Sequence, residues 1–203
     1  MRRTRGFGVL LGLCACALGV RAEGFFEAEH PIDGARVLIV DVPSTPLTVV
    51  GCDASVPESC PNTLRYEGRW LATGSTSEQA QRNARAPSMR YEQEERISRL
   101  RAEVPLEVDG LVDLLLDEVQ LPGDVDVDLR TALGDVDVRG MTAAVLVDVD
   151  IGDVSIAGAP SSVGVHTGRG SIEASMSADA DLRTGGGDVV VEQVGGARDL
   201  FVS

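Results

Sequence analysis

The chain has 203 residues, no lysine, and 18 arginines against 32 acidic residues, which gives a net charge of −14. This length suits one domain with a core of its own. The acidity argues against a nucleic-acid partner, because the phosphates would repel the chain. Aromatic residues make up only 3 %, so few side chains are available to stack on the bases of a single strand.

The N-terminus has the pattern of an export signal. Three arginines within the first five residues precede an apolar run at 7–18, which is too short to span a bilayer. Val20 and Ala22 place small residues before a cleavage site after Ala22, so residues 1–22 are predicted to be a signal peptide. The alternative is lipidation of Cys16, which would anchor the chain to a membrane. Both interpretations predict an exported protein, periplasmic or at the surface of a bacterial envelope, with no transmembrane span in the mature chain.

Two cysteines remain after such a cleavage, Cys52 and Cys60. An even pair in an oxidising compartment predicts a disulfide. Closing so short a loop stabilises a protein by about 2–3 kcal/mol in the chain-entropy model. The alternatives are a metal site, for which no histidine lies nearby in the sequence, and a redox pair.

The next part of the chain, residues 23–110, is predicted to be an irregular β region. Strand-like apolar runs lie at 35–42, 47–50 and 64–71. A short helix is predicted over 75–86, with Ser75 as its N-cap, and Pro87 ends it. Since its only apolar residues are alanines, this helix is expected to lie on the surface.

Residues 111–203 contain a repeat. Glycine recurs at positions 134, 152, 170 and 187, followed by Asp-Val in three copies and by Ser-Ile in the third. Seven residues before each glycine a strand begins, in which apolar and polar residues alternate, and a second short strand follows the glycine. One such unit cannot bury its apolar face alone, whereas stacked units can. The spacing therefore predicts an all-β fold, a parallel β-solenoid with coils of about 18 residues that continues the preceding region as one domain. The competing interpretation is an antiparallel sandwich of hairpins.

The carboxylates of this repeat suggest a metal. Asp135, Asp153 and Asp188 would stack in successive coils, and calcium would screen their repulsion. The alternative is that each aspartate caps its own turn. No catalytic motif is present, His30 and His166 lie far apart in the sequence, and no cofactor is predicted.

The Gly-Asp-Val units at this spacing, together with Leu-Pro-Gly-Asp at 121–124 and the export signal, resemble the bacterial putative-adhesin family, a β-strand-repeat domain of unknown function. The resemblance covers residues 35–203 and implies a right-handed β-helical fold in an exported protein without known catalytic residues. The resulting hypothesis is a non-catalytic adhesin-like or envelope scaffold module with an acidic repeat surface, whose partner is an envelope protein or polysaccharide. The alternatives are a calcium-binding β-repeat protein and a carbohydrate-active β-helix enzyme.

The last residues of the chain predict an interaction. Leu200-Phe201-Val202 has the composition of one more strand, with nothing after it to cover its edge. Such an edge is a template for another strand. Weak self-association through the C-terminal edge is therefore expected.

Overall fold

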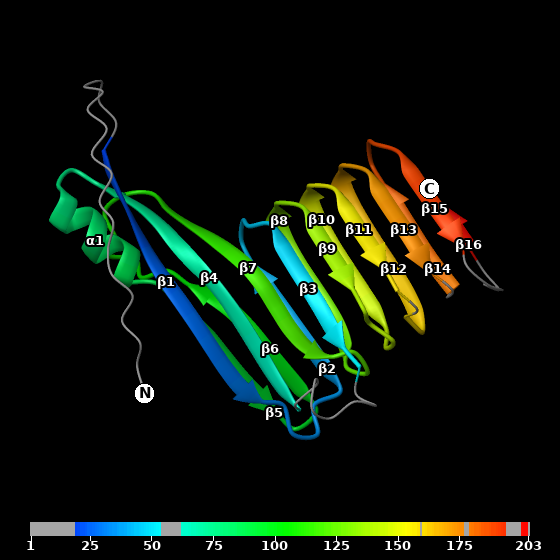
Figure 1. The fold of residues 1–203 in the computed structure, drawn as a ribbon. Coiled ribbons are helices and arrows are strands. Elements are labelled where there is room, and N and C mark those ends of the chain that lie inside the picture. Colours follow the sequence, from blue (N-terminus) through cyan, green and yellow to red (C-terminus); the bar gives the residue numbers. More distant parts are fainter. Residues whose placement is uncertain (1–18, 54–61, 159, 177–178, 194–199, 203) are drawn as a thin grey trace.

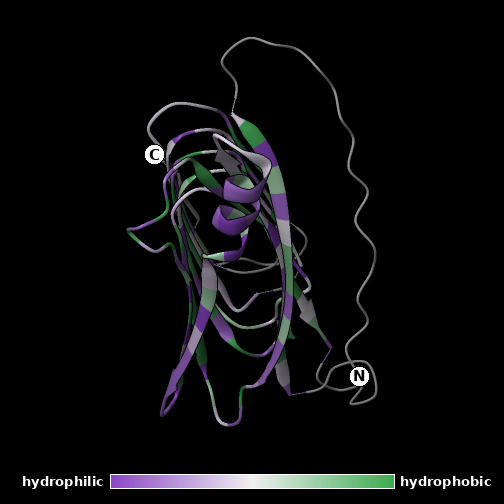
Figure 2. Cartoon of the chain, turned by 90° about the vertical axis from the view of Figure 1, so that its left-hand side faces the viewer, coloured by the Kyte–Doolittle hydropathy of each residue, from purple (hydrophilic) through white to green (hydrophobic). Residues whose placement is uncertain are grey.

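The computed structural model describes residues 19–53, 62–158, 160–176, 179–193 and 200–202. It consists of two eight-stranded sheets that face each other (Figures 1 and 2). In spatial order, sheet A contains β1 (Val20–Pro31), β4 (Thr63–Gly74), β7 (Val112–Pro122), β3 (Leu47–Cys52), β9 (Val136–Arg139), β11 (Val154–Ala157), β13 (Ile172–Met176) and β15 (Val189–Gln193). Sheet B contains β16 (Leu200–Val202), β14 (Asp179–Thr184), β12 (Ser162–Arg169), β10 (Val145–Ile151), β8 (Asp126–Leu133), β2 (Val37–Val42), β6 (Ile97–Glu103) and β5 (Ser88–Glu94).

The repeat strands pair in parallel at the registers that the spacing predicts. Val145 lies opposite Val127 on one side and Val163 on the other, and Val154 is likewise between Val136 and Ile172. All six side chains are buried, and successive units therefore place apolar residues in continuous columns between the sheets. The inward and outward assignments made from alternation are confirmed for these strands.

The glycine of each unit is required by its backbone. Gly170 has φ of +152°, a conformation that L side chains rarely adopt, and Gly134 and Gly187 have similar values. A Cβ on Gly170 would also overlap the backbone of Gly152 in the preceding unit. The repeated glycine therefore allows neighbouring turns to approach closely.

The prediction of a right-handed parallel β-solenoid is wrong, because both sheets are mixed. β4 pairs antiparallel with β1 and with β7, and β5 pairs antiparallel with β6. The region taken for irregular β structure contains the two longest strands, β1 and β4, of 12 residues each. Its strands also insert out of chain order, since β2 lies between β6 and β8. The repeat spacing does not predict this pairing, because antiparallel strands need only alternation and no repeated motif, and β1, β4 and β7 are far apart in the sequence.

The single described helix, α1 (Ser77–Arg85), is shorter than the predicted 75–86. Its N-cap is Thr76 and not Ser75, because the Thr76 hydroxyl accepts the backbone N–H of Gln79. It lies against β1 and β4 and buries Ala80 and Ala84, so it is a covering element as well as a surface one. In Figure 2 it lies at the end of the molecule that carries β1, the edge strand of sheet A.

The predicted signal peptide falls largely outside the described residues, as does Cys16. Its last three residues, 20–22, begin β1 and pair with 72–74 of β4, so that cleavage after Ala22 would leave β1 starting at Glu23. No helix among the described residues is long and apolar enough to cross a membrane.

Candidate functional site

The aspartates proposed as calcium ligands have structural roles in the repeat. The Asp135 carboxylate accepts the backbone N–H of Asp153 (2.9 Å), and the Asp153 carboxylate accepts that of Ser171 (2.7 Å). Ser171 continues the ladder by accepting the N–H of Asp188 (3.4 Å) through its hydroxyl. Each side chain therefore binds the next turn and not its own, which differs from the predicted cap. Among the described residues, no three His, Cys, Asp or Glu side chains are arranged to hold a metal ion.

The other residues singled out in the sequence do not form one site. Cys52 ends β3, but Cys60 lies outside the described residues, so that the disulfide stays a prediction. His166 is exposed on the outer face of sheet B, 3.1 Å from the Asp148 carboxylate. His30 lies in β1, on the edge strand of the other sheet.

The outer face of sheet B carries paired charges of both signs. Along one row across the strands, Asp41, Arg130, Asp148, His166 and Arg183 are consecutive neighbours. The arginines also bind carboxylates two residues away on their own strands, as Arg183 does with Asp181 (2.8 Å). These hydrogen-bonded carboxylates raise the pKa of Arg130 and Arg183 above its ordinary value. Opposite charges alternate from Asp41 through Arg130 to Asp148, and Arg183 is paired on its own strand, so these charges compensate one another locally.

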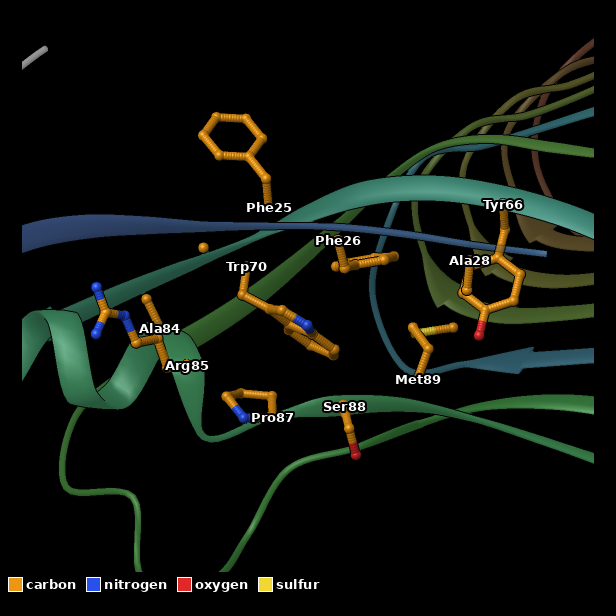
Figure 3. A pocket seen from close by; sticks show the side chains of 11 residues that line it. Phe25, Phe26, Ala28, Tyr66, Trp70, Ala84, Arg85, Pro87, Ser88 and Met89 are labelled. Atoms are coloured by element: carbon orange, nitrogen blue, oxygen red, sulfur yellow. The ribbon is translucent and has the colours of Figure 1, made fainter. Parts of the chain in front are cut away.

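A concave feature of the surface is a cavity of about 360 Å³ at the edge of the molecule formed by β1 of sheet A and β5 of sheet B. It lies between the edge strands β1 and β5, beside the C-terminal end of α1 (Figure 3). Figure 3 shows Phe26, Trp70 and Met89 turned into this space, whereas Phe25 points away from it. We call this cavity the edge cleft; its lining consists of Gly24, Phe25, Phe26, Ala28, Tyr66, Trp70, Ala84, Arg85, Pro87, Ser88 and Met89.

The edge cleft gathers aromatic side chains that are rare in this chain. The only tryptophan and one of two tyrosines line it, and both are almost fully buried. The Phe26 ring lies 5.8 Å from that of Trp70 and 6.3 Å from that of Tyr66, in tilted arrangements typical of aromatic pairs. Two small residues of β1, Gly24 and Ala28, flank Phe26 on the inward face. Gly24 packs closely against α1, because a Cβ there would overlap the Ala84 carbonyl oxygen, whereas Ala28 lines the cavity.

One end of the edge cleft is closed by a stack of rings. His30 stacks on Tyr91 of β5 at 4.4 Å and on Tyr66 of β4 at 5.7 Å, and its Nε2 lies 3.2 Å from the Tyr66 hydroxyl. The Tyr91 hydroxyl also donates to the carbonyl of Pro31 (3.1 Å), which ties β5 to the end of β1. Burial lowers the pKa of His30 and raises that of Tyr66, so both side chains are held neutral here at neutral pH.

The outer face beside the edge cleft is acidic. Glu27, Glu67 and Glu118 lie directly opposite one another on β1, β4 and β7, and like charges in such positions repel. Arg65 is the basic residue paired with this row, at 2.7 Å from Glu27 and 3.9 Å from Glu67. Glu29 is the next outward residue of β1, so the edge strand presents two neighbouring carboxylates.

The edge cleft could not be predicted from the sequence, since Phe26 precedes Tyr66 by 40 positions and Trp70 by 44. A signal was present in β1, where Phe25-Phe26 stands among glutamates and small residues. Nothing local indicated that β4 and β5 would meet this segment.

The chain is only distantly similar to known proteins. No family model matches the sequence, and no curated protein does. Solved structures that the chain matches include a putative cell adhesion protein from Clostridium sporogenes, with 10 % identity, a TM-score of 0.49, and coverage of 85 % of this chain and 100 % of that one. Another is a putative adhesin from Bacteroides fragilis, with 9 % identity, a TM-score of 0.39, and coverage of 89 % and 94 %. A third, a putative adhesin from Parabacteroides merdae, has 7 % identity, a TM-score of 0.24, and coverage of 88 % and 96 %. None of these similarities reaches a TM-score of 0.5, and none assigns an activity to this chain.

Proposed function

We propose that this chain is a non-catalytic, exported, adhesin-like module that binds a component of the bacterial envelope through the edge cleft. The observation that carries the proposal is the concentration of aromatic side chains around an open cavity. Aromatic and apolar linings with few polar groups are typical of binding sites. Burial lowers the pKa of His30 and raises that of Tyr66, so both side chains are neutral at neutral pH, and the two rings stack on each other.

The repeat half acts as the scaffold in this proposal. Its parallel strands bury apolar columns, and its outer polar residues bind one another, as in the ladder from Asp135 to Ser171 and the pair of Arg183 with Asp181. Side chains that are already paired offer less to a ligand than an open apolar cavity does. The binding surface is therefore placed at the end of the molecule where β1 and β5 lie.

The partner in this proposal is an envelope protein or an envelope polysaccharide. The test is retention of envelope material on immobilised protein, followed by identification of what is retained. Ala28→Phe should abolish retention, because Ala28 faces the cavity and a phenyl ring would fill it. The matched control is Ala157→Phe, which introduces the same ring at an exposed outward position of β11. Equal retention by both variants and the unchanged protein would contradict the proposal.

A further inference from the structure

The edge cleft lies where the next strand of a sheet would place its inward side chains. β1 pairs with β4 along one edge, and no described strand pairs with its other edge. Residues of β1 alternate, so that Phe26, Ala28 and His30 face inward while Glu27 and Glu29 face outward. Throughout the interior of both sheets, the inward positions of neighbouring strands fill the space between the sheets. Beyond β1 that space is the cavity.

We propose that the edge cleft binds an extended peptide segment of a partner protein, which adds to sheet A along the free edge of β1. This inference rests on the proposed function and names the class of partner. An added strand would satisfy the backbone N–H and C=O groups along the free edge of β1 and would place apolar side chains in the cavity. Main-chain hydrogen bonds supply affinity in this mode of recognition, and the cavity supplies specificity.

The charges on β1 define the outward side chains of the bound peptide. A strand added to β1 continues the outward row of Glu27, Glu67 and Glu118, in which Arg65 is the paired cation. A basic residue of the peptide beside Glu27 would offset this repulsion, and a second would face Glu29. The partner segment therefore alternates basic outward residues with apolar inward ones. Phe25, 74 % exposed on the same outward face, adds an apolar contact at one end of the row.

β1 is favoured over β5 as the docking strand. Cleavage after Ala22 would leave nine residues of β1, 23–31, against seven in β5, which still gives the peptide a longer edge to pair with. Three carboxylates, those of Glu27, Glu67 and Glu118, share the one paired arginine, Arg65, beside β1. On β5, by contrast, Arg90 is bound to both Glu92 and Glu103. Two side chains of β5 are also engaged, because the Tyr91 hydroxyl donates to the Pro31 carbonyl and the Gln93 side-chain amide donates to the Asp33 carbonyl.

The inference can be tested with synthetic peptides, because Trp70 is the only tryptophan and lines the edge cleft. The probe is a short peptide that alternates lysine with valine, added to the purified exported protein. We expect it to change the Trp70 fluorescence saturably and to raise the melting temperature, with both effects weakening as salt increases. Two control peptides replace lysine by glutamate or place a proline in the centre, and neither should bind.

Variants of the protein separate the two parts of the interaction. Ala28→Phe should weaken lysine-valine peptide binding at least about tenfold by filling the cavity. Glu27→Gln and Glu29→Gln should each weaken it by up to about fivefold, the range of an exposed ion pair. Glu173→Gln, at an exposed outward position of β13 far from the edge cleft, is the matched control and should have no effect.

Several results would overturn the inference. Equal binding of the glutamate or proline peptide would reject charge selection or strand addition. A fluorescence response to decanoate without one to the lysine-valine peptide would identify a pocket for amphiphiles instead. Loss of the response through self-association would identify a second copy as the occupant. If Ala28→Phe abolishes retention of envelope material while the peptide fails to bind, the peptide inference is wrong and the proposed function stands.

Discussion

Replacing Gly170 by alanine should strongly destabilise the protein, although it adds only one methyl group. The new Cβ would overlap the carbonyl oxygen of Gly152 and lie 2.5 Å from its carbonyl carbon, at a φ of +152°. Both atoms belong to the backbone of the neighbouring turn and cannot rotate away. The two turns must therefore separate, or Gly170 must leave its backbone conformation.

The cost follows from the contacts at this point. A residue other than glycine in such a conformation costs about 1–3 kcal/mol. Separation of the turns would also break the bond from Ser171 N–H to the Asp153 carboxylate (2.7 Å) and that from the Thr167 hydroxyl to the Gly152 carbonyl (3.1 Å). Each hydrogen bond is worth about 1 kcal/mol. We expect a total loss of about 3–5 kcal/mol, a large part of the stability of a domain of this size.

Thermal unfolding followed by circular dichroism would measure this loss. At about 2–4 °C per kcal/mol, the melting temperature should fall by about 6–20 °C. Gly186→Ala is the matched control, because a Cβ there would meet no atom within 4 Å, and it should change stability by less than about 0.5 kcal/mol. Equal melting temperatures for the two variants would refute the close approach of successive turns.

Four further predictions concern the core, the cysteines, the ring stack and the C-terminal edge. Val147→Asp should unfold the repeat half, because the Val147 side chain is only 4 % exposed between neighbouring strands and an unpaired buried charge costs several kcal/mol. A circular dichroism melt equal to that of the wild type would contradict the inward placement of Val147. Cys52 and Cys60 should appear as a linked peptide in mass spectrometry without reduction, and two free thiols after export would reject the pair. Because burial lowers the pKa of His30, the unfolded chain binds its proton first, near pH 6.5. Stability should therefore fall as the pH drops below about 6.5 toward the lowered pKa of the folded state, and His30→Phe should flatten this dependence in thermal melts. We also propose weak self-association through β15 and β16, the C-terminal edge strands, which sedimentation should show increasing with salt as the repulsion is screened; a monomer at both low and high salt would oppose it.

The sequence alone determined the register of the repeat strands. Valines at 127, 145 and 163 recur at a constant spacing with alternating neighbours, and in the structure they face one another inside sheet B. Alternation and turn glycines are local properties, since a residue two positions away faces the same side and a positive φ selects glycine. The sequence pattern therefore predicts the strand pairing correctly in the repeat, where each unit pairs with the neighbouring units.

Only the tertiary structure decided the mixed sheets, the helix cap and the edge cleft. Antiparallel pairing of β1, β4 and β7 joins segments that share no motif, so no spacing in the sequence indicates it. Thr76 and not Ser75 caps α1, because the position of the chain leaving β4 selects between adjacent hydroxyl residues. The edge cleft depends on Phe26, Trp70 and Met89, which come from three different strands and meet only because the two sheets end there, with a side of the core uncovered.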